Sequence, residues 1–296
     1  MIDFSTLQGL TIPEGVVTQI ADASGRVIWV LKSGTKAVLQ VEKITATTYA
    51  GETEYPDESF ISISVYPKTN GTVKVTYGGL TKTVTDTSGV ESPNLQSVSF
   101  GTLYGVADSV ATPNSGELTI EGEFYAFGCG TYRSKGKVGE SYLNCGCIIA
   151  VSEWGEVSSI PTGAFQDCTS LTLTSLPSGI TSIDYAAFSG CTSLTLTSLP
   201  SGVTSIGQLA FYNCTSITSI TIPASVTSIG GLAFGQSSIR RTIYFLGTTP
   251  PVIPTDSWPF STVVDTIFVV PKGCGDAYRA AGYAREGYTD TITEAS

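Results

Sequence analysis

Cysteine has the most reactive side chain in this sequence, and the chain contains seven. Cys168, Cys191 and Cys214 are equally spaced in the sequence, and Ser237 stands at the next equivalent position. In stacked coils such residues would lie about 5 Å apart, as neighbouring strands do, which is close enough for a disulfide in principle. We favour a column of small buried thiols, because metal ligands converge on one point and do not form a ladder.

The other four cysteines lie outside this column. Cys129, Cys145 and Cys147 are close together in the sequence, and Cys274 lies near the C-terminal end. One pair among the first three could form a disulfide if the protein is extracellular, and the odd total leaves at least one free thiol. The disulfide state of all four therefore stays open. No metal site is expected, because the chain also contains no histidine.

Residues that could catalyse a reaction are scarce. Histidine, the commonest general base near neutral pH, is absent, and so is the G-x-S-x-G motif of many serine hydrolases. Glu121 and Glu123 would share one face of a strand, and this pair is the candidate for a glycan-processing enzyme. Carboxylates two residues apart on a strand more often lie on its solvated side. We expect no enzymatic activity and no cofactor, with the glycan-processing enzyme as the alternative from another class.

Composition excludes several kinds of partner. Only 14% of the residues are charged, and 25 acidic against 15 basic residues give a net charge of −10. Binding to nucleic acid needs clustered Lys and Arg, so it is not expected. No apolar run approaches the roughly 18 residues that cross a bilayer, so membrane insertion is not expected either. Many glycines and few charged residues favour a mainly β protein.

A repeat of about 23 residues, a period typical of stacked arrays, occupies much of the second half of the chain. One unit, residues 203–225, reads V-T-S-I-G-Q-L-A-F-Y-N-C-T-S-I-T-S-I-T-I-P-A-S, and further copies begin at Val157, Ile180 and Val226. So short a unit cannot close a core alone, so we expect its apolar positions to stack on those of neighbouring units. The sequence therefore predicts a solenoid of parallel coils.

Spacing within the repeat resembles that of a known family. The pattern L-x-x-L-x-L is similar to leucine-rich repeats, and the segments A-F-x-x-C-T-S-L and I-P-x-S-V-T-S-I-G resemble the BspA-like class found on bacterial surfaces. This resemblance implies an adhesin-like role at a bacterial surface. The opening, L-T-I-P-x-G-x-V-x-x-I-x-D-x-x-G-R-V-I-W, is similar to structural proteins from prophages of gut bacteria. It implies the alternative of a phage tail or other virion protein that recognises a host surface.

The register of the repeat strand is open in the first two copies. Thr174 and Thr197 occupy the position that Ile220 fills in the third copy. Either these threonines are buried or the strand has slipped by one residue, which would exchange its two faces. With a slip, Leu173 and Leu196 would face the core. Without a slip, they would face solvent.

Five segments are predicted along the chain. They are an N-terminal attachment segment (1–31), an immunoglobulin-like β-sandwich (32–127), a junction with the N-terminal cap of the solenoid (128–156), the leucine-rich repeats (157–239) and a C-terminal cap (240–296). The sandwich rests on apolar-polar alternation, as at Ile61, Ile63 and Val65, and on turn signals at Asn70–Gly71 and Gly78–Gly79.

Both ends of the chain carry further structural signals. In the attachment segment, residues 22–25 form the turn of a strand-turn-strand pattern. In the C-terminal cap, residues 240–245 and 266–270 are predicted strands, and residues 275–281 a short amphipathic helix. Residues 1–10 lack the basic and long apolar regions of a secretory signal.

Threonines give the repeats their candidate binding surface. We define the threonine ribbon as two threonines in each of three copies, which would run down the solenoid, and we add two leucines whose exposure depends on the register. These candidate ligand-binding residues are Thr169, Thr172, Thr192, Thr195, Thr215, Thr218, Leu173 and Leu196. Tyr185, Tyr212 and Trp154 are further candidates if they are exposed. The expected function is non-enzymatic recognition of a host or bacterial surface protein or glycan, in an extracellular, cell-surface or virion location.

Overall fold

The computed structural model describes residues 20–21, 27–29, 35–42, 44–45, 59–68, 71–85, 96–102, 113, 115–122, 124–129, 131–133, 142–144, 147–236, 240–260, 266–283 and 291–296. Contacts divide the chain into two units, residues 1–35 and 36–296, and each is described by itself. In the first unit, β1 (Ile20–Ala21) pairs antiparallel with β2 (Val27–Trp29). The two predicted strands are thus present, and the predicted turn between them lies outside the described residues.

The second unit begins with a β-sandwich. Its first sheet has five strands in the order β13 (Ile148–Trp154), β3 (Thr35–Glu42), β9 (Ser115–Gly122), β6 (Thr72–Tyr77) and β7 (Leu80–Thr85). Its second sheet joins β10 (Phe124–Cys129), β5 (Ser59–Pro67) and β4 (Ile44–Thr45), with β8 (Gln96–Thr102) also paired to β5. A separate two-stranded ribbon consists of β11 (Thr131–Arg133) and β12 (Tyr142–Asn144).

The predicted alternation is confirmed in β6, whereas in β5 Ser64 is buried together with Ile63 and Val65, and the side chain of Ile61 lies outside the described residues. Val73, Val75 and Tyr77 of β6 are buried, whereas Lys74 between them is exposed. Apolar side chains from both sheets belong to one core, because alternate residues of a strand point to the same face. Burial of one face of each sheet therefore holds the sandwich together.

Of the two predicted hairpin turns, one is confirmed. Gly78 and Gly79 have φ of 58° and 81° and join β6 to β7 in a two-residue turn, a conformation that favours glycine. At Asn70–Gly71 the Gly71 N–H donates to the Lys68 carbonyl over 2.6 Å, as in a turn, but the predicted hairpin is wrong, because β5 and β6 belong to different sheets. The chain crosses there from one layer of the sandwich to the other; Asn70 itself lies outside the described residues.

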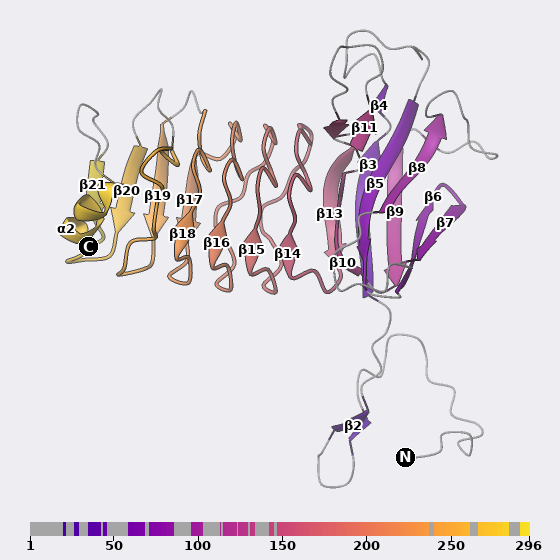
Figure 1. The fold of residues 1–296 in the computed structure, drawn as a ribbon, viewed down its shortest axis with the longest axis horizontal. Helices are drawn as coiled ribbons and strands as arrows, with labels where there is room; N and C mark the ends of the chain where they lie inside the picture. The colour runs from indigo at the N-terminus through magenta and orange to yellow at the C-terminus, as the bar shows by residue number, and fades with distance from the viewer. Residues whose placement is uncertain are drawn as a thin grey trace. The chain divides into compact units, whose positions relative to one another are not determined.

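Four short parallel strands mark successive coils of the solenoid. They are β14 (Ser159–Ile160), β15 (Ser182–Ile183), β16 (Ser205–Ile206) and β18 (Ser228–Ile229), each paired with the next at an offset of one repeat. Figure 1 shows these coils side by side. The return side of each coil is also bonded to the next, as where the Phe188 N–H donates to the Ala210 carbonyl over 2.8 Å. The predicted solenoid of parallel coils is confirmed.

A column of stacked phenylalanines fills the core of the coils. The rings of Phe165, Phe188, Phe211 and Phe234 follow one another at centroid distances of 5.2, 5.4 and 5.2 Å, with planes within 9° of parallel. Phe260 continues the column at 5.9 Å. Because each ring contacts the equivalent ring of the neighbouring coil, no coil buries its phenylalanine without its neighbours.

The sandwich packs directly on the first coil. The Cys129 N–H of β10 donates to the Ala164 carbonyl over 2.6 Å, and the Thr172 N–H donates to the Ile149 carbonyl of β13 over 3.0 Å. Phe127 and Trp154 also contact the ring of Phe165 edge-on. Strand β13, in the segment predicted as junction and cap, is a sandwich strand paired with β3. The sandwich thus covers the N-terminal end of the phenylalanine column.

A parallel sheet continues the solenoid to its C-terminal end. It contains β17 (Ser219–Ile222), β19 (Arg241–Phe245), β20 (Thr266–Val270) and β21 (Thr291–Glu294), followed in space by α2 (Gly275–Tyr278) and the wider helical turn η2 (Arg279–Tyr283). The two predicted strands and the short helix of the cap are confirmed. Tyr278 and Tyr283 are fully buried, and their hydroxyls donate to the carbonyls of Gly247 and Pro251.

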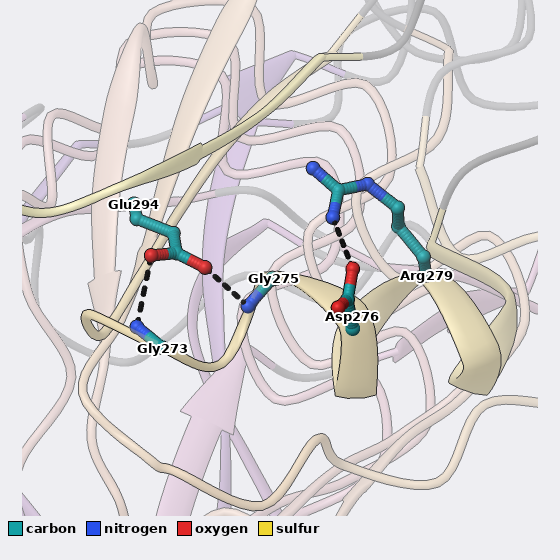
Figure 2. A network of polar contacts seen from close by, with 5 residues as sticks. All are labelled: Gly273, Gly275, Asp276, Arg279 and Glu294. Carbon is teal, nitrogen blue, oxygen red and sulfur yellow. Dashed lines mark hydrogen bonds and ion pairs between the residues drawn. The ribbon is translucent and has the colours of Figure 1, made fainter.

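A carboxylate holds the start of this helix, as Figure 2 shows. Glu294 of β21 accepts hydrogen bonds from the N–H groups of Gly273 and Gly275, both over 2.9 Å. These bonds satisfy donors that a helix start leaves without partners. Asp276 and Arg279 form an ion pair of 2.8 Å on the exposed side of the same turn. Backbone hydrogen bonds lower the pKa of Glu294 below its ordinary value.

Removing one ring from the column should destabilise the whole solenoid. We expect Phe211→Ala to lower the free energy of unfolding by about 3–5 kcal/mol, because the cavity lies between two rings that cannot both close on it. Phe211→Leu should cost clearly less, since it keeps most of the buried volume. Denaturant unfolding followed by circular dichroism measures both variants, and equal, small losses would contradict a continuous core.

The helix start should be sensitive to acid. Because the pKa of Glu294 is lower in the folded chain, its stabilising contribution is complete above its ordinary pKa and is lost as the pH falls through the folded value. Glu294→Gln should therefore lower the thermal unfolding temperature near neutral pH, and lower it by less at about pH 3, which is below the ordinary pKa of a glutamate. Asp276→Asn, which removes only the exposed ion pair, is the control and should change it less. Equal effects of Glu294→Gln at both pH values would contradict this assignment.

Candidate functional site

The structure exposes most of the threonine ribbon. Thr169, Thr172, Thr195 and Thr218 are exposed, and Thr192 and Thr215 are half-buried. The Thr192 and Thr195 hydroxyls each donate to a carbonyl of the preceding coil over 3.4 Å, and the Thr172 hydroxyl donates to the Ile149 carbonyl of the sandwich strand β13 over 3.4 Å. These bonds use the hydroxyl protons, so lone pairs and methyl groups remain for a partner. The binding role of the six threonines stays a prediction.

Leu173 and Leu196 are not surface residues. They are 6% and 1% exposed, whereas Thr174 and Thr197 are exposed, so the prediction that these leucines contact a ligand is wrong. Burying a leucine gains free energy, whereas burying a threonine hydroxyl without a partner costs it. The chain therefore turns locally to bring the leucine inward. Register is recovered by Ser198, which bridges to Thr221 at the normal offset of one repeat.

The predicted column of buried thiols is confirmed within the described residues. Cys168, Cys191 and Cys214 are fully buried, and burial raises the pKa of each, to about 12 for Cys214. The Cys191 and Cys214 thiols donate to the carbonyls of Phe165 and Phe188. They are structural donors, protonated at neutral pH.

A second thiol contact joins the sandwich to the first coil. The Cys129 sulfur lies 2.8 Å from the Cys168 sulfur. Although burial acts to raise the pKa of Cys129, hydrogen bonds from Cys147 and Cys168 lower it well below its ordinary value. Cys274 is, like Cys129 and Cys168, a free thiol, Cys147 is buried, and Cys145 lies outside the described residues. Among the residues that the structure describes, no cluster of three or more metal-ligating side chains forms.

The further aromatic candidates differ in their exposure to solvent. Tyr185 is 48% exposed and qualifies as a surface residue. Tyr212 is half-buried, and Trp154 is half-buried against Phe127 and Phe165. Trp154 is therefore part of the contact between sandwich and coil.

The two positions that follow each short strand vary among the coils, and the first copy has Pro161 and Thr162 there. Asp184 and Tyr185 follow β15, where the third copy has Gly207 and Gln208 and the fourth has two glycines. The backbone comes so close there that a Cβ on Gly207 would lie 2.5 Å from the Asp184 carbonyl carbon. Small residues in the later coils thus leave a hollow beside the aspartate and tyrosine. We call this the array groove, a space of about 740 Å³ lined by Asp184, Tyr185, Gly207, Gln208, Gly230 and Val252, among others.

A second hollow lies where the sandwich meets the first two coils. We call it the junction hollow, a space of about 470 Å³ lined by Tyr66, Tyr125, Ser158, Ser159, Pro161 and Asp184, among others. Asp184 lines both hollows. Burial, and then the negative charge of Asp184, raise the pKa of Tyr66 above its ordinary value, so its hydroxyl keeps its proton.

A β-bulge sets the position of Tyr125. In the pairing of β10 with β5, Phe124 lies opposite Pro67 and Ala126 opposite Tyr66, which leaves Tyr125 as the extra residue. Bulges of this kind redirect a side chain and are frequent next to functional sites. Phe124 and Ala126 are buried, whereas Tyr125 is 41% exposed and faces the junction hollow. The sequence alternation alone did not reveal this site.

The candidate catalytic carboxylates do not form a described pair. Glu121 is exposed on β9, and Glu123 lies outside the described residues. The structure therefore does not test their separation.

Stacked coils of equal length with a shared apolar column define a leucine-rich repeat solenoid, which here follows a β-sandwich. Residues 139–249 match the BspA type leucine rich repeat region, in six copies. The matched range includes residues on both sides of the four copies, which span residues 157–239. No curated protein matches the chain.

Among solved structures, a leucine-rich repeat protein from Bacteroides ovatus ATCC 8483 is similar over 56% of this chain and 75% of that chain. The sequence identity is 14% and the TM-score is 0.14. In the described part of the present chain, no helix has the length and apolar character that a membrane span requires.

Substitution should separate the core leucines from the exposed threonines. We expect Leu196→Ala to lower the free energy of unfolding by about 2–5 kcal/mol, because it leaves a cavity in a packed core. Thr195→Ala, next to it on the exposed side, should change the stability by about 0.5 kcal/mol or less. Urea unfolding measures the free energy of unfolding of both variants. A negligible loss of this free energy in Leu196→Ala would place the Leu196 side chain outside the core.

Proposed function

We propose that this protein is a non-enzymatic recognition protein that binds a surface protein or glycan on the exposed face of its repeats. One observation carries the proposal: the coils keep the same buried residues, whereas the two positions after each short strand vary, and the second coil places a half-buried aspartate, Asp184, and an exposed tyrosine, Tyr185, there. Solenoids also offer extended surfaces to their partners.

The BspA type repeats support a location at a cell surface or outside the cell, because proteins with such repeats are typically associated with surfaces. The low charge of the repeats also bears on the kind of partner that they bind. Between residues 157 and 239 the only Asp, Glu, Lys or Arg residues are Asp167 and Asp184. A surface of this kind suits a partner that is recognised by shape and hydroxyl groups, and not by opposite charge.

Blocking variants of the full chain test the proposal. The full chain is screened against printed oligosaccharides and purified extracellular and bacterial surface proteins. Two double variants place lysines on the array, Thr172→Lys with Thr195→Lys on the ribbon, and Gln208→Lys with Ser228→Lys in the array groove. Thr81→Lys with Thr83→Lys, at exposed positions of β7 in the sandwich, is the matched control.

We expect binding to at least one probe, with a loss of about tenfold or more in affinity for one array variant and none for the control. A loss of affinity in the ribbon variant would support binding on the threonine ribbon. A loss of affinity in the groove variant would support binding in the hollows. A loss confined to the β7 control would overturn the proposal. So would a hydrolase activity on the oligosaccharides that Glu121→Ala abolishes.

A further inference from the structure

We propose that the junction hollow and the array groove together form a binding site for a neutral oligosaccharide. The inference rests on the proposed recognition function and specifies its ligand. Tyr66 and Tyr125 come from the sandwich, and Asp184 and Tyr185 from the second coil. Residues far apart in the sequence therefore contribute to one surface, and Asp184 belongs to both of its parts.

Tyrosines in these hollows fit the apolar faces of sugar rings. Tyr125 and Tyr185 are 41% and 48% exposed, and they are among the most exposed large apolar side chains that the structure describes. A tyrosine ring offers a flat apolar face together with a polar hydroxyl, which matches a pyranose with its C–H face and its hydroxyl groups. Because these side chains are exposed, a stacked sugar would remove apolar surface from water.

Polar groups in the hollows fit sugar hydroxyls. The Asp184 carboxylate can accept two hydroxyl protons, and hydrogen bonds to a charged acceptor are stronger than neutral ones. The Tyr66 hydroxyl keeps its proton and can donate to a sugar oxygen. Ser158 and Ser159 add hydroxyls to the lining of the junction hollow. Aromatic walls with a few converging polar groups are the usual composition of a small-ligand site.

The charge and the volume of the two hollows limit the class of ligand that fits them. The residues that line the two hollows include Asp184 and no Lys or Arg. A phosphate, sulfate or carboxylate on the ligand would be repelled by Asp184, so a neutral saccharide is favoured over an acidic one. The volumes of about 470 and 740 Å³ fall in the range of small-ligand sites, roughly 300–1,000 Å³. Because the two hollows share Asp184, an oligosaccharide fits better than a single ring.

An arginine-bearing peptide is the competing occupant. A guanidinium could stack on tyrosine and pair with Asp184, so both ligands use the same residues. The hollows contain one carboxylate against three tyrosines, a ratio that favours stacking over ion pairing. The two occupants differ in salt dependence, because an ion pair with the half-buried Asp184 carboxylate weakens as the ionic strength rises, whereas the stacking of a neutral sugar does not.

The test uses the full chain on a printed array of neutral and acidic oligosaccharides, followed by calorimetry with the oligosaccharide that binds best. We expect binding to neutral members that changes little between about 0.05 and 0.5 M salt. Tyr125→Ala and Tyr185→Ala should each weaken it about tenfold or more, and Asp184→Asn should weaken it as well. Tyr244→Ala is the matched control, because Tyr244 is 42% exposed on β19 and lines neither hollow.

Several results would overturn the inference. Unchanged binding in Tyr125→Ala and Tyr185→Ala, with native unfolding temperatures, would place the sugar elsewhere. Binding only to acidic sugars, or salt-sensitive binding of an arginine-rich peptide that Asp184→Asn abolishes, would contradict a neutral saccharide. If the array-blocking lysines abolish binding to a protein probe while no oligosaccharide binds, this inference fails and the recognition function stands. If the full chain binds neither kind of probe, both fail.

Discussion

The whole solenoid depends on contact between equivalent apolar positions of neighbouring coils. Phe188 and Phe211 stack at 5.4 Å because the chain returns to the same position after each repeat, and the thiols beside them donate to carbonyls of the preceding coil. A single coil would expose both the ring and its backbone groups to water. Stability therefore comes from repetition, and each coil contributes mainly through its two interfaces.

A repetitive core leaves two open ends, and the chain closes them in different ways. At the N-terminal end, the sandwich itself covers the column through Phe127 and Trp154. At the C-terminal end, Phe260 prolongs the column, and Tyr278 and Tyr283 bury their rings in the cap. The N-terminal closure also creates the junction hollow, because it brings β10 next to the first coils. Covering the core and forming the candidate site are thus two results of one contact.

Much of the fold could be predicted from the sequence because its signals are periodic. The spacing of Phe165 and its equivalents predicts the stacked column, and the alternation around Val73 and Val75 predicts a half-buried strand. What the patterns could not predict are local departures from them. The inward turn of Leu196 depends on which of two neighbouring side chains is better buried, and the bulge at Tyr125 depends on its pairing with β5. Asp184 is one of two charged residues in residues 157–239, but its position beside Tyr66 depends on how the sandwich packs on the coils.

The candidate site lies where the repeat stops being regular. The coils that carry Gly207 and Gly230 leave space for the array groove. Asp184 and Tyr185 of the second coil line this groove with groups that can bind a partner. The most direct measurement is a crystal structure of the full chain soaked with the oligosaccharide that binds best. We expect sugar density at Asp184, with one ring against Tyr125 or Tyr185. Density on the threonine ribbon, with both hollows free of sugar, would contradict it.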